Sequence, residues 1–151
     1  MFRIRTAVDQ QLRALVKENL RETNSRRSPV MRALRGTAAD SEVPVETYAL
    51  EGSPGHSGEV LAGGLVGHAW AHWLHIDLLW VDERHRGSGL GSRLVAEAEH
   101  LAREQHGCTG SRVETFDFQA PGFYRKAGYT LVGTVEDYPP GCTDHLLVKK
   151  L

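Results

Sequence analysis

The sequence predicts a single mixed α/β domain over residues 1–151. Its length is that of one domain. A content of 40% hydrophobic and 25% charged residues is typical of a globular protein. Along the chain, apolar residues at helical spacing alternate with strand-like apolar runs, as expected for a sheet packed against helices. A chain of this length buries roughly two-thirds of its unfolded surface, so one core can hold it without disulfides or a structural metal.

The N-terminal region predicts a helix over residues 6–21, because its apolar residues recur at helical spacing. These residues are Val8, Leu12, Leu15, Val16 and Leu20. Residues 21–35 contain five arginines and one glutamate, and we expect either a solvated loop or a second helix. The functional alternative for this stretch is a positive rim that attracts an anionic cofactor or substrate.

The middle of the chain predicts three strands. Residues 43–50 and 59–70 flank a dense cluster of glycine, serine and proline, which is the pattern of a β-hairpin. Residues 74–81, LHIDLLWV, are almost continuously apolar and predict a buried central strand. A helix is expected over residues 90–101, where leucine, valine and alanine recur at helical spacing.

The C-terminal third predicts three more strands and a short helix. Residues 112–118 read as a strand, and Pro121 fits the first turn of a short helix that Gly128 ends. Two final strands, residues 130–135 and 145–149, are separated by a turn with two prolines and a glycine. No internal repeat or linker interrupts this order.

The charge balance excludes several classes of partner. The net charge is −1, so neither nucleic acid nor an anionic membrane surface is expected as the main partner. No apolar run approaches the roughly 20 residues that span a bilayer, and the start of the chain carries no secretory pattern. We therefore expect a cytoplasmic protein that holds any anion locally.

No metal site is expected. Cys108 and Cys142 lie far apart without CxxC spacing, and both are expected to be small buried thiols. His68, His72 and His75 offer imidazoles, but they lie on a predicted strand–turn–strand segment, where the helical i, i+4 spacing of metal ligands does not apply.

A glycine-rich loop, residues 86–92 (RGSGLGS), lies between the buried strand and the following helix. Glycines let the backbone approach a ligand closely, and free N–H groups at a helix start bind anions. No Lys-Ser/Thr pair closes the motif, so it is not a P-loop. A Rossmann motif is disfavoured because Ser92 stands at the third glycine position. A turn that only changes the chain direction is the remaining alternative.

Two motifs carry a resemblance to the GNAT superfamily of acetyl-CoA-dependent N-acetyltransferases. The loop matches the family signature Gln/Arg-x-x-Gly-x-Gly/Ala with Arg86, Gly89 and Gly91. A second marker after the next strand is matched by Phe123, Tyr124, Lys126, Gly128 and Tyr129. The similarity covers residues 60–151, whereas residues 1–58 match only in the order of their elements. The resemblance implies a GNAT-like mixed sheet in the order β-α-(α)-β-β-β-α-β-α-β-β, splayed to hold acetyl-CoA.

The resemblance also implies a set of cofactor-binding residues. The pyrophosphate of acetyl-CoA would contact the backbone of Arg86, Gly87, Ser88, Gly89, Leu90, Gly91 and Ser92. Its pantetheine arm would pair with the main chain of Leu79, Trp80 and Val81. Arg84 and Arg86 can add positive charge at the rim. Asp117 stands where many relatives have an asparagine that contacts the cofactor, and a carboxylate accepts hydrogen bonds but does not donate them.

Acetyl transfer benefits from a proton donor for the leaving thiolate and from a base or a desolvating pocket for the amine. The resemblance implies that Tyr124 lies beside the cofactor sulfur as the general acid; the alternative is an aromatic that packs the short helix. Period-two alternation places His75 and Asp77 on one face of the buried strand, with Leu79 and Val81. The resemblance implies a base on this strand, and His75 or Asp77 stands where one would be expected. Alternatively, both only orient the cleft, and a water chain or the backbone is the base.

The sequence thus predicts an enzyme, a transferase that moves acetyl from acetyl-CoA to a primary amine by direct attack in a ternary complex. A small-molecule amine is the expected acceptor, and a protein amine is the alternative. A different class of function stays open, namely a non-catalytic acetyl-CoA sensor or regulatory module. A longer acyl group or a hydroxyl acceptor is equally compatible with the loop. The resemblance allows a homodimer, although no sequence feature fixes the oligomeric state.

Overall fold

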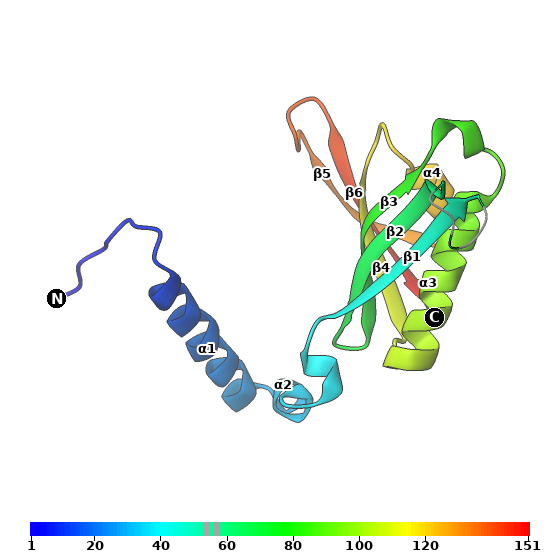
Figure 1. Cartoon of the computed structure of the whole chain (residues 1–151). Helices are drawn as coiled ribbons and strands as arrows, with labels where there is room; N and C mark the ends of the chain where they lie inside the picture. The colour runs from blue at the N-terminus through cyan, green and yellow to red at the C-terminus, as the bar shows by residue number, and fades with distance from the viewer. Residues whose placement is uncertain (53–54, 56–57) are drawn as a thin grey trace. The chain divides into compact units, whose positions relative to one another are not determined.

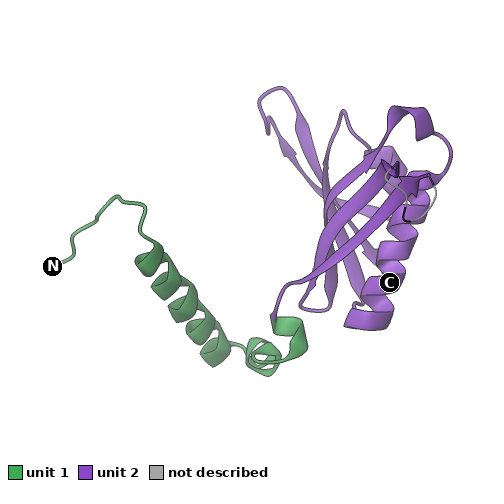
Figure 2. Cartoon of the chain, in the orientation of Figure 1, with its two compact units in different colours: residues 1–40 green, residues 41–151 purple. Residues whose placement is uncertain are grey.

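The computed structural model describes residues 1–52, 55 and 58–151. The chain divides into two compact units, residues 1–40 and residues 41–151 (Figure 2). The expectation of a single domain over residues 1–151 stays a prediction. Within the described residues, no helix has both the length and the apolar character needed to cross a membrane.

The first unit consists of α1 (Gln10–Arg27), α2 (Pro29–Leu34) and a 3-10 turn, η1 (Ala38–Asp40). The helix begins later than expected because Asp9 caps it, its carboxylate accepting a 3.0 Å hydrogen bond from the Leu12 N–H. Ser28 ends α1 and caps α2. The arginine-rich stretch therefore folds as the end of one helix and a second helix.

The strand that the family order places before α1 is not formed. Residues 1–9 have neither helical nor strand structure. A strand needs a neighbour for its backbone N–H and C=O groups, and none of the described strand pairings includes these residues. This element of the implied order is therefore wrong for the structure, while the mixed α/β class is confirmed.

The second unit is a six-stranded sheet with strand order β1-β2-β3-β4-β6-β5 (Figure 1). Its strands are β1 (Val43–Glu51), β2 (Val60–Trp70), β3 (Trp73–Val81), β4 (Gly110–Phe116), β5 (Thr130–Glu136) and β6 (Thr143–Lys150). All neighbours are antiparallel except β3 and β4. Two helices, α3 (Leu90–His106) and α4 (Pro121–Lys126), follow β3 and β4 in the chain. The sheet confirms the expected fold class.

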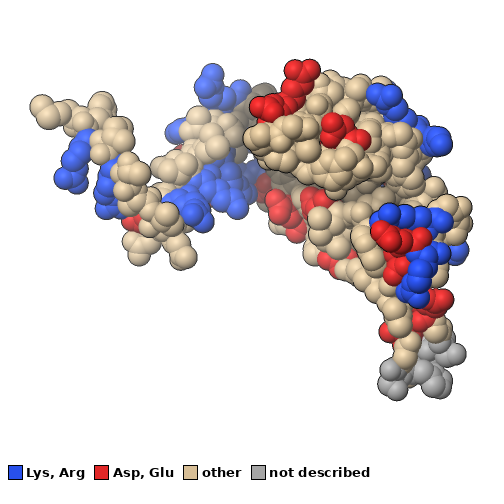
Figure 3. Space-filling model, turned by 90° about the horizontal axis from the view of Figure 1, so that it is seen from above, with Lys and Arg blue, Asp and Glu red and all other residues tan. Residues whose placement is uncertain are grey.

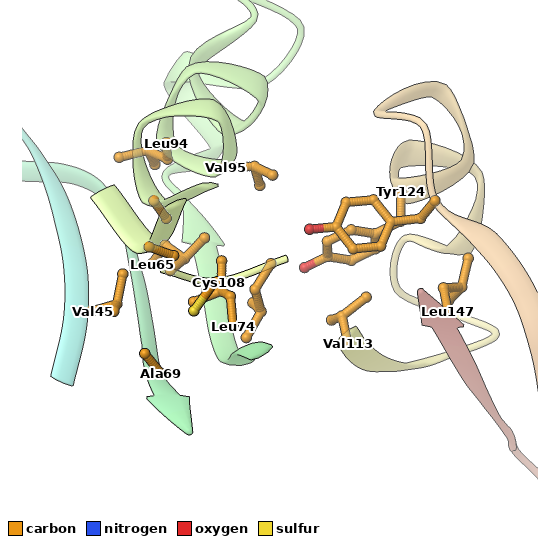
Figure 4. Packing of buried hydrophobic residues seen from close by; sticks show 14 residues of the cluster. Val45, Leu65, Ala69, Leu74, Leu94, Val95, Cys108, Val113, Tyr124 and Leu147 are labelled. Carbon is orange, nitrogen blue, oxygen red and sulfur yellow. The ribbon is translucent and has the colours of Figure 1, made fainter. Parts of the chain in front are cut away.

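Both helices pack on one face of the sheet, here called the helix face. The core lies between them and the sheet, with Leu65, Leu74, Val95 and Leu147 almost completely buried (Figure 4). Along most of β2 and β4 alternate residues point to this face, so that buried positions recur at every second residue, as in Leu65, Gly67 and Ala69. The other side of the sheet is called the opposite face.

The parallel pair β3 and β4 separates part of the way along. Their pairing runs only from Trp73 opposite Gly110 to Ile76 opposite Val113. Beyond this point β3 continues to Val81 and β4 to Phe116 without pairing to each other. The predicted splay of the sheet is therefore present, at the strand ends that lead into α3 and α4.

A β-bulge in β3 corrects one expectation about the site. Ile76 pairs with Gly67 and Leu78 pairs with Val66, so Asp77 is an extra residue. The bulge reverses the alternation. His75 therefore lies on the opposite face, whereas Leu79 and Val81 pack against the core on the helix face. The prediction that these three residues share a face with Asp77 was wrong, because simple period-two alternation does not anticipate an inserted residue.

Candidate active site

The glycine loop connects the end of β3 to the start of α3. A 3-10 turn, η2 (Glu83–His85), leads into it, and Asp82 caps this turn. Gly87 and Gly89 have φ angles of +75° and +82°, a left-handed conformation that other residues rarely adopt. A Cβ atom at either position would meet no atom within 4 Å. Glycine is therefore required for the backbone path, and the space in front of the loop is free for a ligand.

The start of α3 leaves backbone donors available. Gly89 is the N-cap and has no capping side chain. The first helical hydrogen bond runs from the Arg93 N–H to the Gly89 carbonyl, at 3.1 Å. The N–H groups of Leu90, Gly91 and Ser92 precede this bond and have no acceptor within the helix. Such N–H groups, at the positive end of a 17-residue helix, fit the pyrophosphate of acetyl-CoA.

Gly91 has a different role in the same loop. A Cβ atom there would lie 3.4 Å from two ring carbons of Phe123. The start of α3 therefore packs on α4, at a distance where a Cβ atom would make ordinary van der Waals contact with the ring. The two sequence motifs that carried the family resemblance meet at this contact.

The arginines beside the loop are held by nearby groups. The Arg84 side chain donates two hydrogen bonds to Asp82, at 3.0 and 3.1 Å, and this pairing lowers the pKa of the Asp82 carboxyl to about 2. Arg86 donates to the Val81 carbonyl at 3.4 Å and lies 3.6 Å from Glu83. Acidic and basic side chains of residues 41–151 lie interspersed on the face shown in Figure 3. The charge of these guanidinium groups is therefore largely compensated locally.

The splayed edge of β3 supplies further backbone groups. Leu79, Trp80 and Val81 pair with β2 on one side only, because pairing with β4 has already ended. Alternate residues of an edge strand turn both the N–H and the C=O outward. This edge matches the expected contact of the pantetheine arm. Asp117, in contrast, accepts a 2.9 Å hydrogen bond from the Phe118 N–H and so caps its own turn.

Tyr124 lies on α4 and enters the core from the helix face. Its side chain is among the buried residues of Figure 4, with a residue exposure of 4%. Its ring packs edge-on against Phe123 and Tyr129, with centroid separations of 5.1 and 5.5 Å. Burial raises the pKa of the Tyr124 phenol to about 12. The hydroxyl is consequently protonated at neutral pH and can act as a proton donor.

A buried polar network supports the neighbouring ring. The Tyr129 hydroxyl lies 2.7 Å from the Ser111 hydroxyl and donates to the Glu99 carboxylate at 3.0 Å. Lys149 donates to the second oxygen of Glu99 at 2.7 Å. The network joins α3, β4 and β6 beneath Tyr124. Nothing in the sequence alone indicated it, because Glu99 and Lys149 are 50 residues apart.

The opposite face carries the second group of predicted site residues. The Asp77 carboxylate lies 2.9 Å from Nδ1 of His68, and the rings of His68 and His75 stack with centroids 4.7 Å apart. Burial lowers the pKa of His75, and the nearby His68 and Arg112 lower it further. A neutral imidazole at pH 7 follows. His68 was missed as a partner of Asp77, although hairpin register could have identified it.

Two cavities adjoin on this face. One, of about 310 Å³, is lined mainly by apolar groups: Trp70, Ala71, Trp73, His75, Arg112, Leu146 and Val148. The other, of about 200 Å³, is polar and is lined by His75, Ile76, Asp77, Arg112, Val113 and Glu114. His75 and Arg112 line both. The polar cavity lies at the last paired residues of β3 and β4, where the strands begin to separate.

The candidate acid and bases therefore come from different faces of the sheet. Tyr124 belongs to the helix face, and His75 and Asp77 belong to the opposite face. The region where the strands separate lies between them. The three histidines do not form a ligand set: His72 bonds the Gly107 carbonyl, and no metal-binding group of three or more His, Cys, Asp or Glu occurs among the described residues.

Comparison with known proteins agrees with this geometry. The Acetyltransferase (GNAT) family matches residues 13–129. Blasticidin-S acetyltransferase of Streptomyces morookaense is 59% identical over 132 residues, which cover 87% of this chain and 96% of that protein. The structure is similar to a crystal structure of a Bacillus cereus acetyltransferase, with a TM-score of 0.79, 32% identity, and coverage of 99% and 98% of the two chains.

A Bacillus anthracis acetyltransferase solved in complex with acetyl coenzyme A shares the fold, with a TM-score of 0.54 and 18% identity, and the match covers 78% of this chain and 90% of that one. The splayed sheet, the glycine loop and the family match over most of the chain lead to one conclusion. The chain belongs to the GNAT family and is an acyl-CoA-dependent N-acetyltransferase.

Proposed function

We propose that this enzyme transfers the acetyl group of acetyl-CoA to the primary amine of a small molecule by direct attack in a ternary complex. The observation that carries the proposal is the end of β3–β4 pairing at Ile76 and Val113. We infer that this separation opens a passage between the two faces of the sheet, next to a helix start with free N–H groups. A thioester held from the helix face can thus meet an amine that arrives from the opposite face.

Backbone groups would hold the cofactor. The N–H groups at the start of α3 would bind the pyrophosphate, and the free edge at Leu79–Val81 would pair with the pantetheine amides. Bound in this way, acetyl-CoA supplies an activated acetyl group. A local arrangement of amides explains how a chain with a net charge of −1 can bind a strongly anionic cofactor.

The amine must lose a proton before it attacks. For an amine with the pKa of lysine, exposing the lone pair at pH 7 costs about 4–5 kcal/mol. We assign the base to His75, because its imidazole is neutral and borders the polar cavity. Asp77 is already engaged with His68 and is the alternative. The freed amine attacks the carbonyl carbon, the C–S bond breaks, and the leaving sulfur takes a proton from the Tyr124 hydroxyl. The nitrogen loses its second proton to solvent as the amide forms, and solvent returns a proton to the Tyr124 oxygen.

A small-molecule acceptor is supported by the relative that is 59% identical. Its name gives blasticidin S as the molecule that it acetylates. Because the identity extends over 96% of that relative, we include blasticidin S among the acceptors to be tested.

The test combines acetyl-CoA, a panel of primary amines that includes blasticidin S, and an assay for released thiol. Wild-type protein should release thiol with at least one amine. Tyr124→Phe should lower kcat by about 10²-fold or more without changing the affinity for acetyl-CoA. Tyr138→Phe, at a 60% exposed tyrosine, is the matched control. Binding of acetyl-CoA without thiol release from any amine would instead identify a non-catalytic binding module.

A further inference from the structure

We propose that the acceptor carries an aromatic or heteroaromatic ring, which binds in the apolar cavity beside Trp70 and Trp73, and that its reacting amine lies in the adjoining polar cavity. This inference rests on the proposed amine acetylation and specifies its substrate class. It is carried by the hairpin between β2 and β3, by Gly110, and by the two cavities that share His75 and Arg112.

The hairpin turn places the two indole side chains opposite each other. Trp70 pairs with Trp73, so both lie on the opposite face of the sheet. The two turn residues, Ala71 and His72, have φ angles of +51° and +63°. Neither is glycine or asparagine, although this turn geometry strongly favours those residues and costs others about 1–2 kcal/mol each. Unfavourable backbone conformations of this kind cluster at ligand sites.

The surrounding structure holds this turn in place. The His72 carbonyl accepts a 2.8 Å hydrogen bond from the Thr109 N–H, and its Nδ1 lies 3.1 Å from the Gly107 carbonyl. Both partners belong to the connection from α3 to β4. The positions of the indoles are therefore fixed by a second segment, as a preorganised binding site requires.

Gly110 leaves the space that the indole ring of Trp73 occupies. A Cβ atom at this position would lie 2.8 Å from three ring carbons of Trp73. The ring thus lies directly against the backbone of β4, in a place that any side chain would occupy. Trp70 meets the edge of the His75 ring, with a centroid separation of 6.4 Å. Both indoles border a cavity whose remaining lining includes Leu146 and Val148. Flat aromatic groups pack well against such rings.

The polar cavity suits the amine. It brings the carboxylates of Asp77 and Glu114 to the point where β3 and β4 separate. Arg112 lies between the two cavities, and its charge is paired with Glu114 at 2.9 Å. Asp77 adds a further negative group, so an ammonium is favoured over an anion at this end. His75, the proposed base, lines the same cavity.

The strand sets the length of the acceptor. Trp73 and Asp77 are four residues apart, which corresponds to about 13 Å along a strand. Ring and amine should therefore be separated by a spacer on the order of 10 Å. The apolar cavity of about 310 Å³ is at the lower end of the usual size of ligand sites. A compact amine without a ring would leave it unfilled.

The experiment compares arylalkylamines of increasing spacer length with alkylamines of the same length, using thiol release with acetyl-CoA. We expect kcat/KM of the wild type to peak at the spacer of about 10 Å and to favour the aryl compound by about tenfold. Trp73→Leu and Trp70→Leu should each remove most of this preference, because they should lower the rate with the aryl compound much more than the rate with the alkylamine.

Glycine substitutions provide a matched pair. Gly110→Ala should displace the Trp73 ring and reduce the preference for the aryl compound. Gly133→Ala makes the same change in β5, where a Cβ atom meets nothing within 4 Å, and should have no effect. Equal rates for aryl and alkyl amines, or an equal loss on both in the tryptophan variants, would overturn this inference and leave the proposed function intact. Acetyl-CoA binding without transfer to any amine would overturn the proposed function itself.

Discussion

The two faces of the sheet contribute to the site in different ways. On the helix face, the glycine loop and the edge of β3 offer main-chain groups, and Tyr124 is buried in the core. On the opposite face, side chains form the site: an Asp77–His68 pair, a stacked His75, and two cavities. One face therefore recognises a ligand through backbone geometry and the other through side-chain chemistry.

The difference explains why one fold can serve many acceptors. Backbone contacts depend on where the strands separate and where the helix begins, and many sequences can satisfy those conditions. Side-chain contacts change with each substitution. In this chain the bulge at Asp77 reverses the side-chain alternation, so that His75 lies on the acceptor side while Leu79 and Val81 pack in the core. The predictions below test this division of roles between the faces.

The largest effect is expected from Gly89→Glu. The side chain would be forced into a left-handed backbone conformation, at about 1–2 kcal/mol, and its carboxylate would face the proposed pyrophosphate position. Like charges placed together cost several kcal/mol more. We expect the affinity for acetyl-CoA, measured by calorimetry, to fall by about 10³-fold.

Gly141→Glu is the control for this change. Gly141 has a φ angle of +88° and open space around its Cβ position, as Gly89 does, but it lies in the β5–β6 turn. The same substitution there should leave cofactor affinity unchanged. A comparable loss in both variants would mean that backbone strain, and not the anion site, causes the effect.

His75→Gln tests the opposite face. Because burial lowers the pKa of His75, and the nearby His68 and Arg112 lower it further, its imidazole should stay neutral below the ordinary value of about 6.5. Wild-type kcat/KM should therefore fall with decreasing pH only as the pH drops through this lowered pKa. His75→Gln should reduce kcat about 100-fold and abolish this acidic limb.

The groups around His75 allow a control. His68, Arg112, Asp77 and Glu42 all contribute to the pKa of His75, so their variants should shift the acidic limb. His100→Gln, at an exposed position on α3, should not. If the acidic limb of kcat/KM remained at the same pH in His75→Gln, a group other than His75 would be the base.

The sequence predicted the helix face better than the opposite face. The helix 90–101, the strands and the glycine loop follow local rules of periodicity and turn chemistry, and the structure contains them with shifted ends. The N-terminal strand that the family order implied is not formed, because a strand must pair with a neighbour and no local pattern specifies that neighbour. Each of these outcomes reflects whether the deciding interaction is local.

The opposite face depends on contacts between distant residues. The bulge at Asp77 has no signal in the apolar run 74–81, and its partner His68 lies in the preceding strand. The contact between the Trp73 ring and Gly110 joins β3 to β4, which are separated in the sequence by the whole of α3. The role of Gly110 became visible only when the strand register was known.

Tyr129→Phe compares the two faces in stability. The Tyr129 hydroxyl bonds Ser111 and Glu99 in the buried network of the helix face, so its removal leaves two buried polar groups with one partner fewer. The free energy of unfolding in urea should fall by about 1–3 kcal/mol. Tyr48→Phe removes an exposed hydroxyl that bonds Glu46 on the opposite face, and should cause no measurable change. If both variants lost the same free energy of unfolding, the buried network would contribute no more to stability than the exposed Tyr48–Glu46 contact.

The smallest effect is expected from Arg84→Gln, which separates backbone recognition from side-chain charge within the helix-face site. Arg84 stands beside the loop, but both of its hydrogen bonds from the guanidinium go to Asp82. A positive charge that is already paired and exposed adds little to the binding of another anion. Acetyl-CoA affinity should therefore change by less than about threefold at moderate salt, where a Debye length of about 8–10 Å screens exposed charges. A loss approaching that of Gly89→Glu, or one that disappears at high salt, would mean that guanidinium charge and not the helix-start amides holds the pyrophosphate. Backbone recognition would then no longer explain how a chain with a net charge of −1 binds a strongly anionic cofactor.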